Sequence, residues 1–282
     1  MRDLSHSYEY SRERRRGKRR FEDDEPLFQK RQRHARGLPS LDVIDATDGL
    51  PEGDRWSTWD QPDAGERGPE PYPDWLVTEL AAVDTELGIL KTGKEADVFL
   101  LRRAVPQTGP SCLLAAKRYR DAEHRMFHRD SGYVEGRRVR QSRTNRAVAG
   151  RTAFGRQALA GQWAGAEFGA LVQLFLAGVP VPYPVSVLGT EVLLEFIGTA
   201  DGTAAPRLAE LRPPKALLAS LWDQLVEAMV TLARHGLAHG DLSAYNLLVH
   251  DERLVMIDLP QVVDVIANPQ GASYLERDAA NV

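Results

Sequence analysis

The sequence predicts an α+β fold made of two lobes. Three strand-like runs, a long helical run and two further strand-like runs follow one another between residues 88 and 198. The rest of the chain is mostly helical and contains one short hairpin pattern. This order predicts that residues 195–198 connect the two lobes and lie beside a ligand cleft, because ligand sites commonly form where two packed units meet.

The overall composition is that of an ordinary globular protein: 282 residues, 43% of them hydrophobic, with a net charge of -4. The single cysteine, Cys112, excludes an intrachain disulfide, and no Cys or His spacing matches a zinc site. The sequence shows neither an apolar leader nor a run of 18 apolar residues. We therefore expect a cytoplasmic location and no membrane partner.

The charge is unevenly distributed along the chain. Residues 1–37 carry a net charge of +5, and residues 38–75 carry -8. No apolar period runs through residues 1–72, which predicts a disordered basic arm followed by an acidic spacer. The arm is either a solvated tail or, through the arginines at 12–20, a site for RNA or another acidic partner. A single folded domain is expected at 73–282.

The first lobe is predicted over about 73–194. Residues 74–87 have the pattern of a short helix, and residues 88–93 and 96–103 that of two strands joined by a turn. A third strand is predicted at 112–119, with Lys117 and Tyr119 on one face. Residues 118–156 contain 11 Arg, 4 acidic residues and few apolar ones, so we expect a mobile basic loop there.

A long helix is predicted at 154–178, followed by strands at 184–189 and 191–198. The second lobe, at about 199–282, begins with a helix at 213–236, and continues with short strands at 247–250 and 254–258 and a helix through 273–281. The residues predicted to face inward are Leu159, Trp163, Leu171 and Leu174 on the first helix, and Leu218, Leu221, Trp222, Leu225, Met229 and Leu232 on the second.

The loop at 239–246 reads His-Gly-Asp-Leu-Ser-Ala-Tyr-Asn, and Ile-Asp follows at 257–258. Asp241 supplies a base or a carboxylate that orients a nucleophile, while Asn246 and Asp258 supply the oxygen ligands that Mg²⁺ prefers. In phosphoryl transfer Mg²⁺ bridges phosphate oxygens and offsets their charge. The occurrence of both motifs in this order favours phosphoryl transfer over a turn with only local hydrogen bonds.

A buried ion pair is predicted between Lys117 and Glu167. Glu167 lies on the apolar stripe of the predicted long helix, and an unpaired buried carboxylate costs about 3 to 5 kcal/mol, so a cationic partner is expected. Lys117, in an apolar strand, is the candidate. The pair would hold the amine against the α- and β-phosphates of a nucleotide. A purely structural ion pair is the alternative.

The turn at 91–97 reads Lys-Thr-Gly-Lys-Glu-Ala-Asp. Gly93 permits a close approach of backbone N–H groups to phosphate, and Lys94 adds positive charge. Hairpin turns commonly contain Gly and Lys, so it is the position of the turn ahead of Lys117 that makes it a candidate phosphate loop.

Taken together, these motifs resemble the RIO family of atypical serine/threonine protein kinases. The match extends from about Gly88 to Val282. It includes Thr-Gly-Lys-Glu-Ala-Asp-Val at 92–98, Lys117, the basic insertion with Gly-Tyr-Val-Glu-Gly-Arg-Arg at 132–138, Trp163 to Glu167, Glu-Phe-Ile-Gly at 195–198, the loop at 239–246, Ile-Asp-Leu-Pro-Gln at 257–261 and Leu-Glu-Arg-Asp-Ala-Ala-Asn-Val at 275–282.

The resemblance implies a protein-kinase-like fold that binds ATP with Mg²⁺, or with Mn²⁺ in its place, between two lobes. It implies that Asp241 is the catalytic base, that Asn246 and Asp258 bind the metal, and that Asp258 can itself accept phosphate, as in family members that act as ATPases. The remaining residues that it implies are Lys117 and Glu167 in the catalytic set, Thr92, Gly93, Lys94 and Glu95 at the phosphates, and Glu195 and Ile197 as the hinge that holds adenine.

Two residues depart from the family's pattern: Lys91 replaces a small residue, and Ala244 replaces an acidic one. The basic insertion resembles the first RIO subfamily and Ile-Asp-Leu-Pro-Gln the second; the lack of a winged-helix-sized stretch before Gly88 favours the first. The ratio of 30 Arg to 6 Lys suggests a bacterial source. No activation segment follows Asp258, so we expect the peptide platform of ordinary protein kinases to be missing.

Three functions remain open at this point. The first is an ATP-dependent phosphotransferase of RIO type that acts on serine or threonine of a protein or of itself, or mainly as an ATPase. The second is a small-molecule kinase similar to aminoglycoside phosphotransferases, in which His-Gly-Asp and a later Ile-Asp also occur. The third is an ATP-gated protein that binds RNA or a ribosomal particle through the basic arm and insertion.

Overall fold

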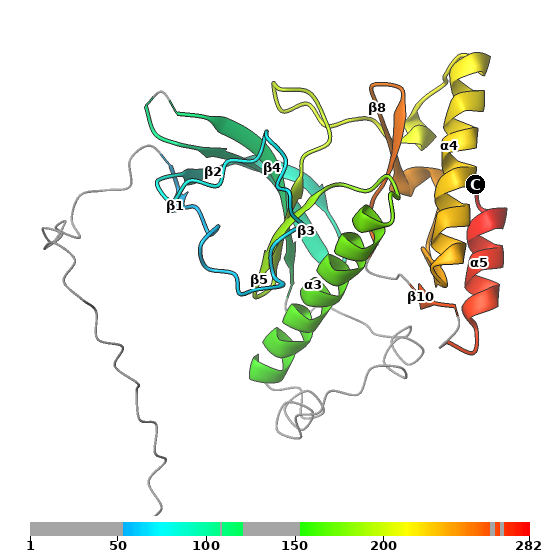
Figure 1. Cartoon of the computed structure of the whole chain (residues 1–282), viewed down its shortest axis with the longest axis horizontal. Coiled ribbons are helices and arrows are strands. Elements are labelled where there is room, and N and C mark those ends of the chain that lie inside the picture. The colour runs from blue at the N-terminus through cyan, green and yellow to red at the C-terminus, as the bar shows by residue number, and fades with distance from the viewer. Residues whose placement is uncertain (1–52, 108, 121–152, 260–262, 266–267) are drawn as a thin grey trace, which may run out of the picture. The chain divides into compact units, whose positions relative to one another are not determined.

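The computed structural model describes residues 53–107, 109–120, 153–259, 263–265 and 268–282. All of them belong to one compact unit, Gly49–Val282. A six-stranded antiparallel sheet and three α-helices make up most of this described part, so the predicted α+β class is confirmed (Figure 1). The predictions for the basic arm at 1–37 and for residues 121–152 of the insertion lie outside the described residues.

The sheet has the strand order β1-β2-β3-β4-β6-β5. Its strands are β1 Arg55–Trp56, β2 Val83–Thr92, β3 Ala96–Ala104, β4 Ser111–Tyr119, β5 Pro184–Leu188 and β6 Glu191–Glu195. The strands predicted at 88–93, 96–103, 112–119 and 184–189 are confirmed, and the strand predicted at 191–198 ends at Glu195. Alternation of apolar and polar residues therefore located most of the sheet.

The helix predicted at 74–87 is wrong, because β2 begins within this stretch, at Val83. Asp84 of β2 lies opposite Arg103 of β3, and their side chains form a fully buried ion pair with Nε and Oδ1 2.7 Å apart. Ahead of the strand, Leu76 and Val77 pack into the core of the sheet. Pairing across the sheet and burial of this ion pair outweigh the local helical pattern.

The boundary predicted at residue 73 is also wrong, because residues 53–72 pack against the sheet. Trp59 is only 8% exposed and lies in the same apolar cluster as Leu114 and Tyr183. The backbone N–H of Gly68 donates to the carbonyl oxygen of Val185, at 3.0 Å, on the β5 edge of the sheet. A few aromatic residues anchor this segment, although its acidic composition is typical of a disordered spacer. The folded part therefore begins no later than residue 53.

The long helix is α3, Ala153–Leu176, and Gly178 follows it with a φ of 80°. The helix packs against β4, β5 and β6 and contributes Ala160, Ala164 and Phe168, from its middle part, to one apolar cluster (Figure 1). Its C-terminal half contributes Leu171 and Leu174 to a second cluster, which contains the residues of the C-terminal lobe. The helix therefore belongs to two cores. The loop predicted at 118–156 was too long at both ends, because β4 extends to Tyr119 and α3 begins at Ala153.

The C-terminal lobe is mostly helical, as predicted, and it contains two short strand pairings where the sequence predicted one hairpin. Its elements are the 3-10 helix η2 Leu208–Glu210, α4 Lys215–Arg234, β7 Leu237–Ala238, the 3-10 helix η3 Ala244–Asn246, β8 Leu247–His250, β9 Arg253–Met256, β10 Val263–Asp264 and α5 Gly271–Ala280. Strand β8 pairs with β9, and β7 pairs with β10.

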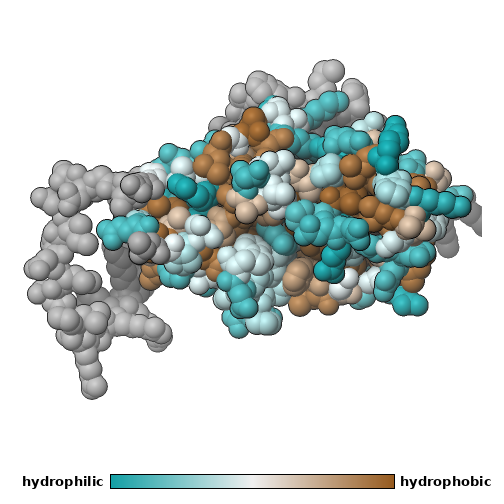
Figure 2. Space-filling model, turned by 90° about the horizontal axis from the view of Figure 1, so that it is seen from above, coloured by the Kyte–Doolittle hydropathy of each residue, from teal (hydrophilic) through white to brown (hydrophobic). Residues whose placement is uncertain are grey.

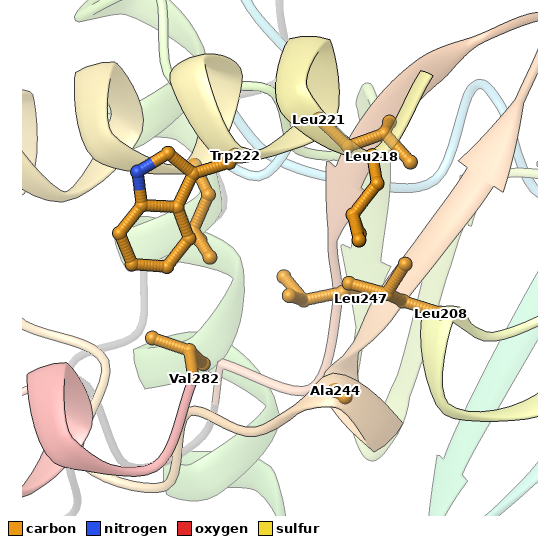
Figure 3. Close-up of a pocket in the computed structure, with 8 residues that line it drawn as sticks. Leu208, Leu218, Leu221, Trp222, Ala244, Leu247 and Val282 are labelled. Carbon is orange, nitrogen blue, oxygen red and sulfur yellow. The ribbon is translucent and has the colours of Figure 1, made fainter. Parts of the chain in front are cut away.

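Two residues of α4 do not face inward as predicted. Leu218 is 48% exposed and Trp222 53% exposed, while Leu221 and Leu225 are buried. All four line an apolar cavity of about 150 Å³, together with Val282 (Figure 3). The buried stripe of α4 is narrower than its apolar stripe because one side of the helix faces solvent.

Apolar residues of this kind appear on the surface as patches separated by hydrophilic residues (Figure 2). In the part of the chain that the structure describes, α4 is the one helix whose length and apolar composition match a membrane span. Its buried leucines contribute to the core of the C-terminal lobe, and core helices of soluble proteins meet the same criterion.

Candidate functional site

Lys117 lies at the centre of a network of charged side chains. It projects from β4 and is 7% exposed, and its Nζ lies 2.6 Å from Oε1 of Glu167 on α3. The same Nζ lies 3.0 Å from Oδ1 of Asp258, which follows β9. The predicted Lys117–Glu167 pair is therefore present, and Asp258 joins it from a distant part of the chain.

The charges in this network reinforce one another. Burial alone would lower the pKa of Lys117, but the carboxylates of Glu167 and Asp258 outweigh burial and raise it above its ordinary value. Burial would raise the pKa of Asp258, but Lys117 and Lys91 hold it well below its usual range. Lys117 is thus held as an ammonium ion and Asp258 as a carboxylate, which is the charge pattern that phosphate and a divalent metal ion require.

Tyr119 is a further member of this network that the sequence analysis did not assign to the site. Its hydroxyl donates a hydrogen bond to Oε2 of Glu167, and its ring lies 5.5 Å from the Nζ of Lys117. Burial and the negative charge of Glu167 raise the pKa of Tyr119. Glu167 therefore has a donor at each oxygen. The position of Tyr119, two residues from Lys117 on the same strand face, was the signal that could have found it.

Lys91 at the end of β2 also contacts Asp258, with Nζ 2.8 Å from Oδ2. Lys91 is one of the two residues that depart from the family's pattern, and no contact was predicted for it. Asp258 thus accepts from two lysines, one at each carboxylate oxygen.

The candidate phosphate loop forms the tight turn between β2 and β3. The N–H of Gly93 donates to the carbonyl oxygen of Ala96 at 3.0 Å. A Cβ at position 93 would lie 2.8 Å from that oxygen, so the turn requires glycine. Thr92 and Lys94 are exposed, and the carbonyl oxygen of Glu95 accepts from the N–H of Arg120 at 3.0 Å.

The loop that carries Asp241 is held by hydrogen bonds to its backbone. The side-chain N–H of Asn246 donates to the carbonyl oxygen of Asp241 at 2.8 Å. Asp241 itself is exposed, and no described residue contacts its carboxylate through a hydrogen bond or an ion pair. The loop is therefore fixed while the Asp241 carboxylate stays available to a substrate.

Asp278 on α5 is a second residue that was not predicted from the sequence, and it holds this loop in place. Its Oδ2 accepts from the N–H of Gly240 at 2.8 Å, and its Oδ1 accepts from the N–H of Leu242 at 3.0 Å. Asp278 is 1% exposed, and the neighbouring Arg277 donates to the carbonyl oxygen of Gly240. These contacts flank Asp241 on both sides. The motif at 275–282 was a signal, although nothing in the sequence connected it to the loop.

His239 completes the support of the loop. It is fully buried, its Nε2 lies 3.1 Å from the carbonyl oxygen of Ile257, and its Nδ1 accepts from the N–H of Asp241. Burial lowers the pKa of His239, so the ring is neutral, and these contacts assign the proton to Nε2. His239 therefore connects the loop to the residue that precedes Asp258.

Asn246 and Asp258 lie at the open end of the β8–β9 hairpin. The N–H of Ile257 donates to the carbonyl oxygen of Asn246 at 3.0 Å, which continues the pairing of Leu247 with Met256. Asp258 has a φ of 67°, in the left-handed region where a residue other than glycine is uncommon. The backbone therefore turns sharply at Asp258, whose side chain contacts Lys91 and Lys117.

The predicted hinge at 195–198 begins with the last residue of β6. The carboxylate of Glu195 accepts from the N–H of Tyr183 at 2.9 Å, and burial raises the pKa of Glu195. The carbonyl oxygen of Ile197 accepts from the N–H of Ala205 at 2.9 Å. Within the described residues, no acceptor contacts the N–H of Ile197.

A comparison with protein-family models finds a match to the RIO domain over residues 114–282, which is more than half of the chain. The chain belongs to the RIO-domain family. The resemblance noted from the sequence motifs is thereby confirmed. The matched region runs from β4 to the C-terminal end of α5 and includes Lys117, Glu167 and the loop at 239–246.

Several named proteins are similar to this RIO domain. The RIO-type serine/threonine-protein kinase Rio1 of Haloferax volcanii is 36% identical over 71% of this chain and 62% of its own length. Rio1 of Thermoplasma acidophilum is 34% identical over 43% of this chain and 61% of its own length. A crystal structure of the Rio2 kinase-ADP/Mg²⁺-phosphoaspartate complex from Chaetomium thermophilum covers 70% of this chain and 54% of that chain, with 21% identity and a TM-score of 0.49.

The chain spans about three fifths of the length of the two Rio1 relatives. Both relatives are named as serine/threonine-protein kinases. The assignment of this RIO domain to the first subfamily stays a prediction.

The oxygen atoms around Asp258 suit a Mg²⁺ ion held jointly by protein and nucleotide. No group of three or more His, Cys, Asp or Glu side chains occurs in the described ranges, so an all-protein metal cage is not present there. Mg²⁺ usually takes one or two carboxylates and completes its shell with water and phosphate oxygens. Because the amide N–H of Asn246 is used by Asp241, its Oδ1 is left as the acceptor atom. The donor set of this RIO domain therefore fits the metal.

Proposed function

We propose that this RIO domain is an Mg-ATP-dependent phosphotransferase that acts as a serine/threonine protein kinase, as an ATPase, or on itself. The observation that carries the proposal is the position of Lys117, 2.6 Å from Glu167 and 3.0 Å from Asp258. In protein kinases a lysine paired with a glutamate orients the nucleotide phosphates, and a nearby aspartate holds Mg²⁺.

On the N-terminal side, Lys117 binds the α- and β-phosphates of ATP, and Glu167 keeps its ammonium group in place. The turn formed by Thr92, Gly93, Lys94 and Glu95 covers the phosphates. The backbone of Glu195 and Ile197 holds the adenine ring. The N–H of Ile197, which no described acceptor contacts, supports this role.

On the C-terminal side, Asp241 accepts the proton of the acceptor hydroxyl or of water. The exposed carboxylate of Asp241 supports this role because a base must reach its substrate. Asn246 and Asp258 would hold Mg²⁺, or Mn²⁺ in its place. When bound, the metal supplies positive charge that offsets the charge developing on the phosphate oxygens.

The acceptor of the phosphate and the partners of the chain are part of the proposal. A serine or threonine of a protein, or of this chain, is the acceptor favoured by the similarity to relatives named as serine/threonine-protein kinases. RNA and ribosomal particles stay a prediction, because the basic arm and residues 121–152 lie outside the described residues. The cytoplasmic location likewise stays a prediction.

The proposal is tested by incubating the full chain with γ-labelled ATP and Mg²⁺ and following the label into free phosphate, protein and small acceptors. We expect Asp241→Asn to lower turnover by about 100-fold or more, because a positioned base contributes about 10² to 10⁴ in rate. The matched control is Asp251→Asn, since its 86% exposed side chain lies in the β8–β9 turn, where asparagine tolerates the positive φ.

The outcomes separate the candidate functions. Unchanged turnover of Asp241→Asn would overturn the proposal. Transfer to aminoglycosides, without transfer to protein or water, would favour the small-molecule kinase. Hydroxylamine releases phosphate from an aspartyl-phosphate and not from phosphoserine, so treatment of labelled protein shows whether Asp258 or a hydroxyl accepts the label.

A further inference from the structure

Lys91 is a charged residue at the site to which the proposed function gives no role. Its Nζ lies 2.8 Å from Oδ2 of Asp258, while the Nζ of Lys117 lies 3.0 Å from Oδ1. Each carboxylate oxygen of Asp258 therefore faces one ammonium group. Among the described residues, Asp258 is the one ion-pair partner of Lys91.

An irregularity in β2 directs Lys91 to this place. Ile89 pairs with Phe99 and Lys91 pairs with Val98, so two residues of β2 advance against one residue of β3. Such a bulge re-aims the side chains that follow it. Ile89 is 56% exposed, whereas Lys91, two residues later, reaches Asp258.

The charges of the site divide into two pairs. Lys117 is matched by Glu167 at 2.6 Å, and Asp258 is matched by Lys91 at 2.8 Å. A Mg²⁺ ion binds a carboxylate oxygen at about 2.0 to 2.1 Å. An ammonium group in hydrogen-bond contact with the same carboxylate would repel that ion and occupy one of the oxygen lone pairs it uses. Lys91 and a divalent metal ion therefore compete for the carboxylate of Asp258.

We propose that Lys91 is a counter-cation that competes with the divalent metal ion for Asp258 and so raises the metal concentration at which the site fills. The inference rests on the proposed function, in that it takes Asp258 as a metal ligand. In the metal-free protein Lys91 keeps the Asp258 carboxylate neutralised and in place. Metal binding displaces the Lys91 ammonium group from Asp258.

The position of Lys91 suits an exchangeable contact better than a support of the fold. The side chains of Lys91 and Asp258 are 36% and 31% exposed, and ion pairs that reach solvent contribute little to stability. By contrast, Lys117 and Glu167 are 9% and 2% exposed. Removing the Lys91 charge should therefore leave the protein folded.

The test measures Mn²⁺ binding to the full chain at saturating ADP, as the fall of the free-Mn²⁺ electron paramagnetic resonance signal below that of the same ADP solution without the chain. The variants are Lys91→Met, Lys91→Arg and, as a matched control, Lys215→Met, which removes an exposed lysine at the start of α4. We expect Lys91→Met to bind Mn²⁺ about three- to tenfold more tightly than the unaltered chain. Lys91→Arg, which keeps the charge, and Lys215→Met should bind Mn²⁺ as the unaltered chain does.

An equal or weaker Mn²⁺ affinity of Lys91→Met would overturn the inference. If the unaltered chain still binds ADP and Mn²⁺ in that case, the proposed function stands and only the role of Lys91 falls. If the unaltered chain binds neither ADP nor Mn²⁺, the proposed function fails, and the inference fails with it. ADP binding to the unaltered chain, measured with Mn²⁺ present, distinguishes these two results.

Discussion

The two sides of the candidate site are built by different means. On the N-terminal side, Lys117, Glu167 and Tyr119 hold one another through side-chain contacts in a buried environment. On the C-terminal side, Asp278 and His239 hold the loop around Asp241 through its backbone. The contacts on the N-terminal side fix the positions of charged groups, and the contacts on the C-terminal side fix the position of a loop.

This difference predicts what happens when a contact on each side is removed by mutation. Loss of a partner on the N-terminal side leaves a charge buried without compensation, which affects both folding and the binding of phosphate. Loss of a partner on the C-terminal side leaves backbone N–H groups unpaired and lets the loop move. The first kind of change should weaken nucleotide binding, and the second should slow turnover while nucleotide binding is kept.

The largest effect is expected from Glu167→Ala. This change removes the carboxylate that pairs with Lys117 and accepts from Tyr119, so it should lower the free energy of unfolding by about 3 to 5 kcal/mol. Urea unfolding measures this loss, and binding of a fluorescent ADP analogue should weaken in parallel. Gln162→Ala, at an exposed position of the same helix, is the control. Full stability of Glu167→Ala would contradict a buried ion pair.

A smaller effect is expected from Asp278→Asn. The asparagine amide has one oxygen, so the N–H of either Gly240 or Leu242 loses its acceptor, at a cost of about 1 to 3 kcal/mol. We expect kcat for phosphate release to fall while the dissociation constant of ADP stays unchanged. A parallel loss of ADP affinity would show that the two sides are not independent, and Glu276→Gln, at an exposed position of α5, is the control.

The smallest effect concerns the pH dependence of stability. Burial lowers the pKa of His239 in the folded state, so below its ordinary pKa of about 6.5 the unfolded chain binds a proton that the folded chain does not. His239 therefore favours folding fully above about pH 6.5, and stability should fall with decreasing pH by at most about 1.4 kcal/mol per unit.

The measurement is the urea midpoint between pH 7.5 and 5.5, compared with that of His239→Gln. Glutamine can still donate to the carbonyl oxygen of Ile257 but does not titrate. We expect the slope to be smaller in this variant. This window lies above the range in which Asp258, whose pKa is lowered by its two lysines, would lose its charge. Identical slopes in both proteins would exclude His239 as the source.

Much of the N-terminal side could be predicted from local patterns. Helical spacing placed Glu167 on an apolar stripe, and a buried carboxylate requires a cation, which pointed to Lys117. Strand alternation located β3 and β4 closely. These inferences succeeded because the secondary structure and the burial of a residue depend largely on the residues within a few positions of it.

Contacts between distant segments could not be predicted in this way. The stretch at 74–87 has a helical pattern, but its pairing with β3 and the buried contact of Asp84 with Arg103 decide its structure. Asp278 meets Gly240 only after the chain has folded back, and Lys91 meets Asp258 through a bulge that leaves no clear pattern in the sequence. The acidic composition around Trp59 likewise gave no indication that this side chain is buried and anchors the segment.

The anchor of the loop at 239–246 has a consequence for the order of events during synthesis. Asp278 is made some 30 residues after Asn246, an interval of about 2 to 6 s at about 5 to 20 residues per second. Lys117 and Glu167 emerge from the ribosome well before either. A nascent chain can therefore pair Lys117 with Glu167 while its loop around Asp241 is still without support, so the buried ion pair can form before the loop is anchored.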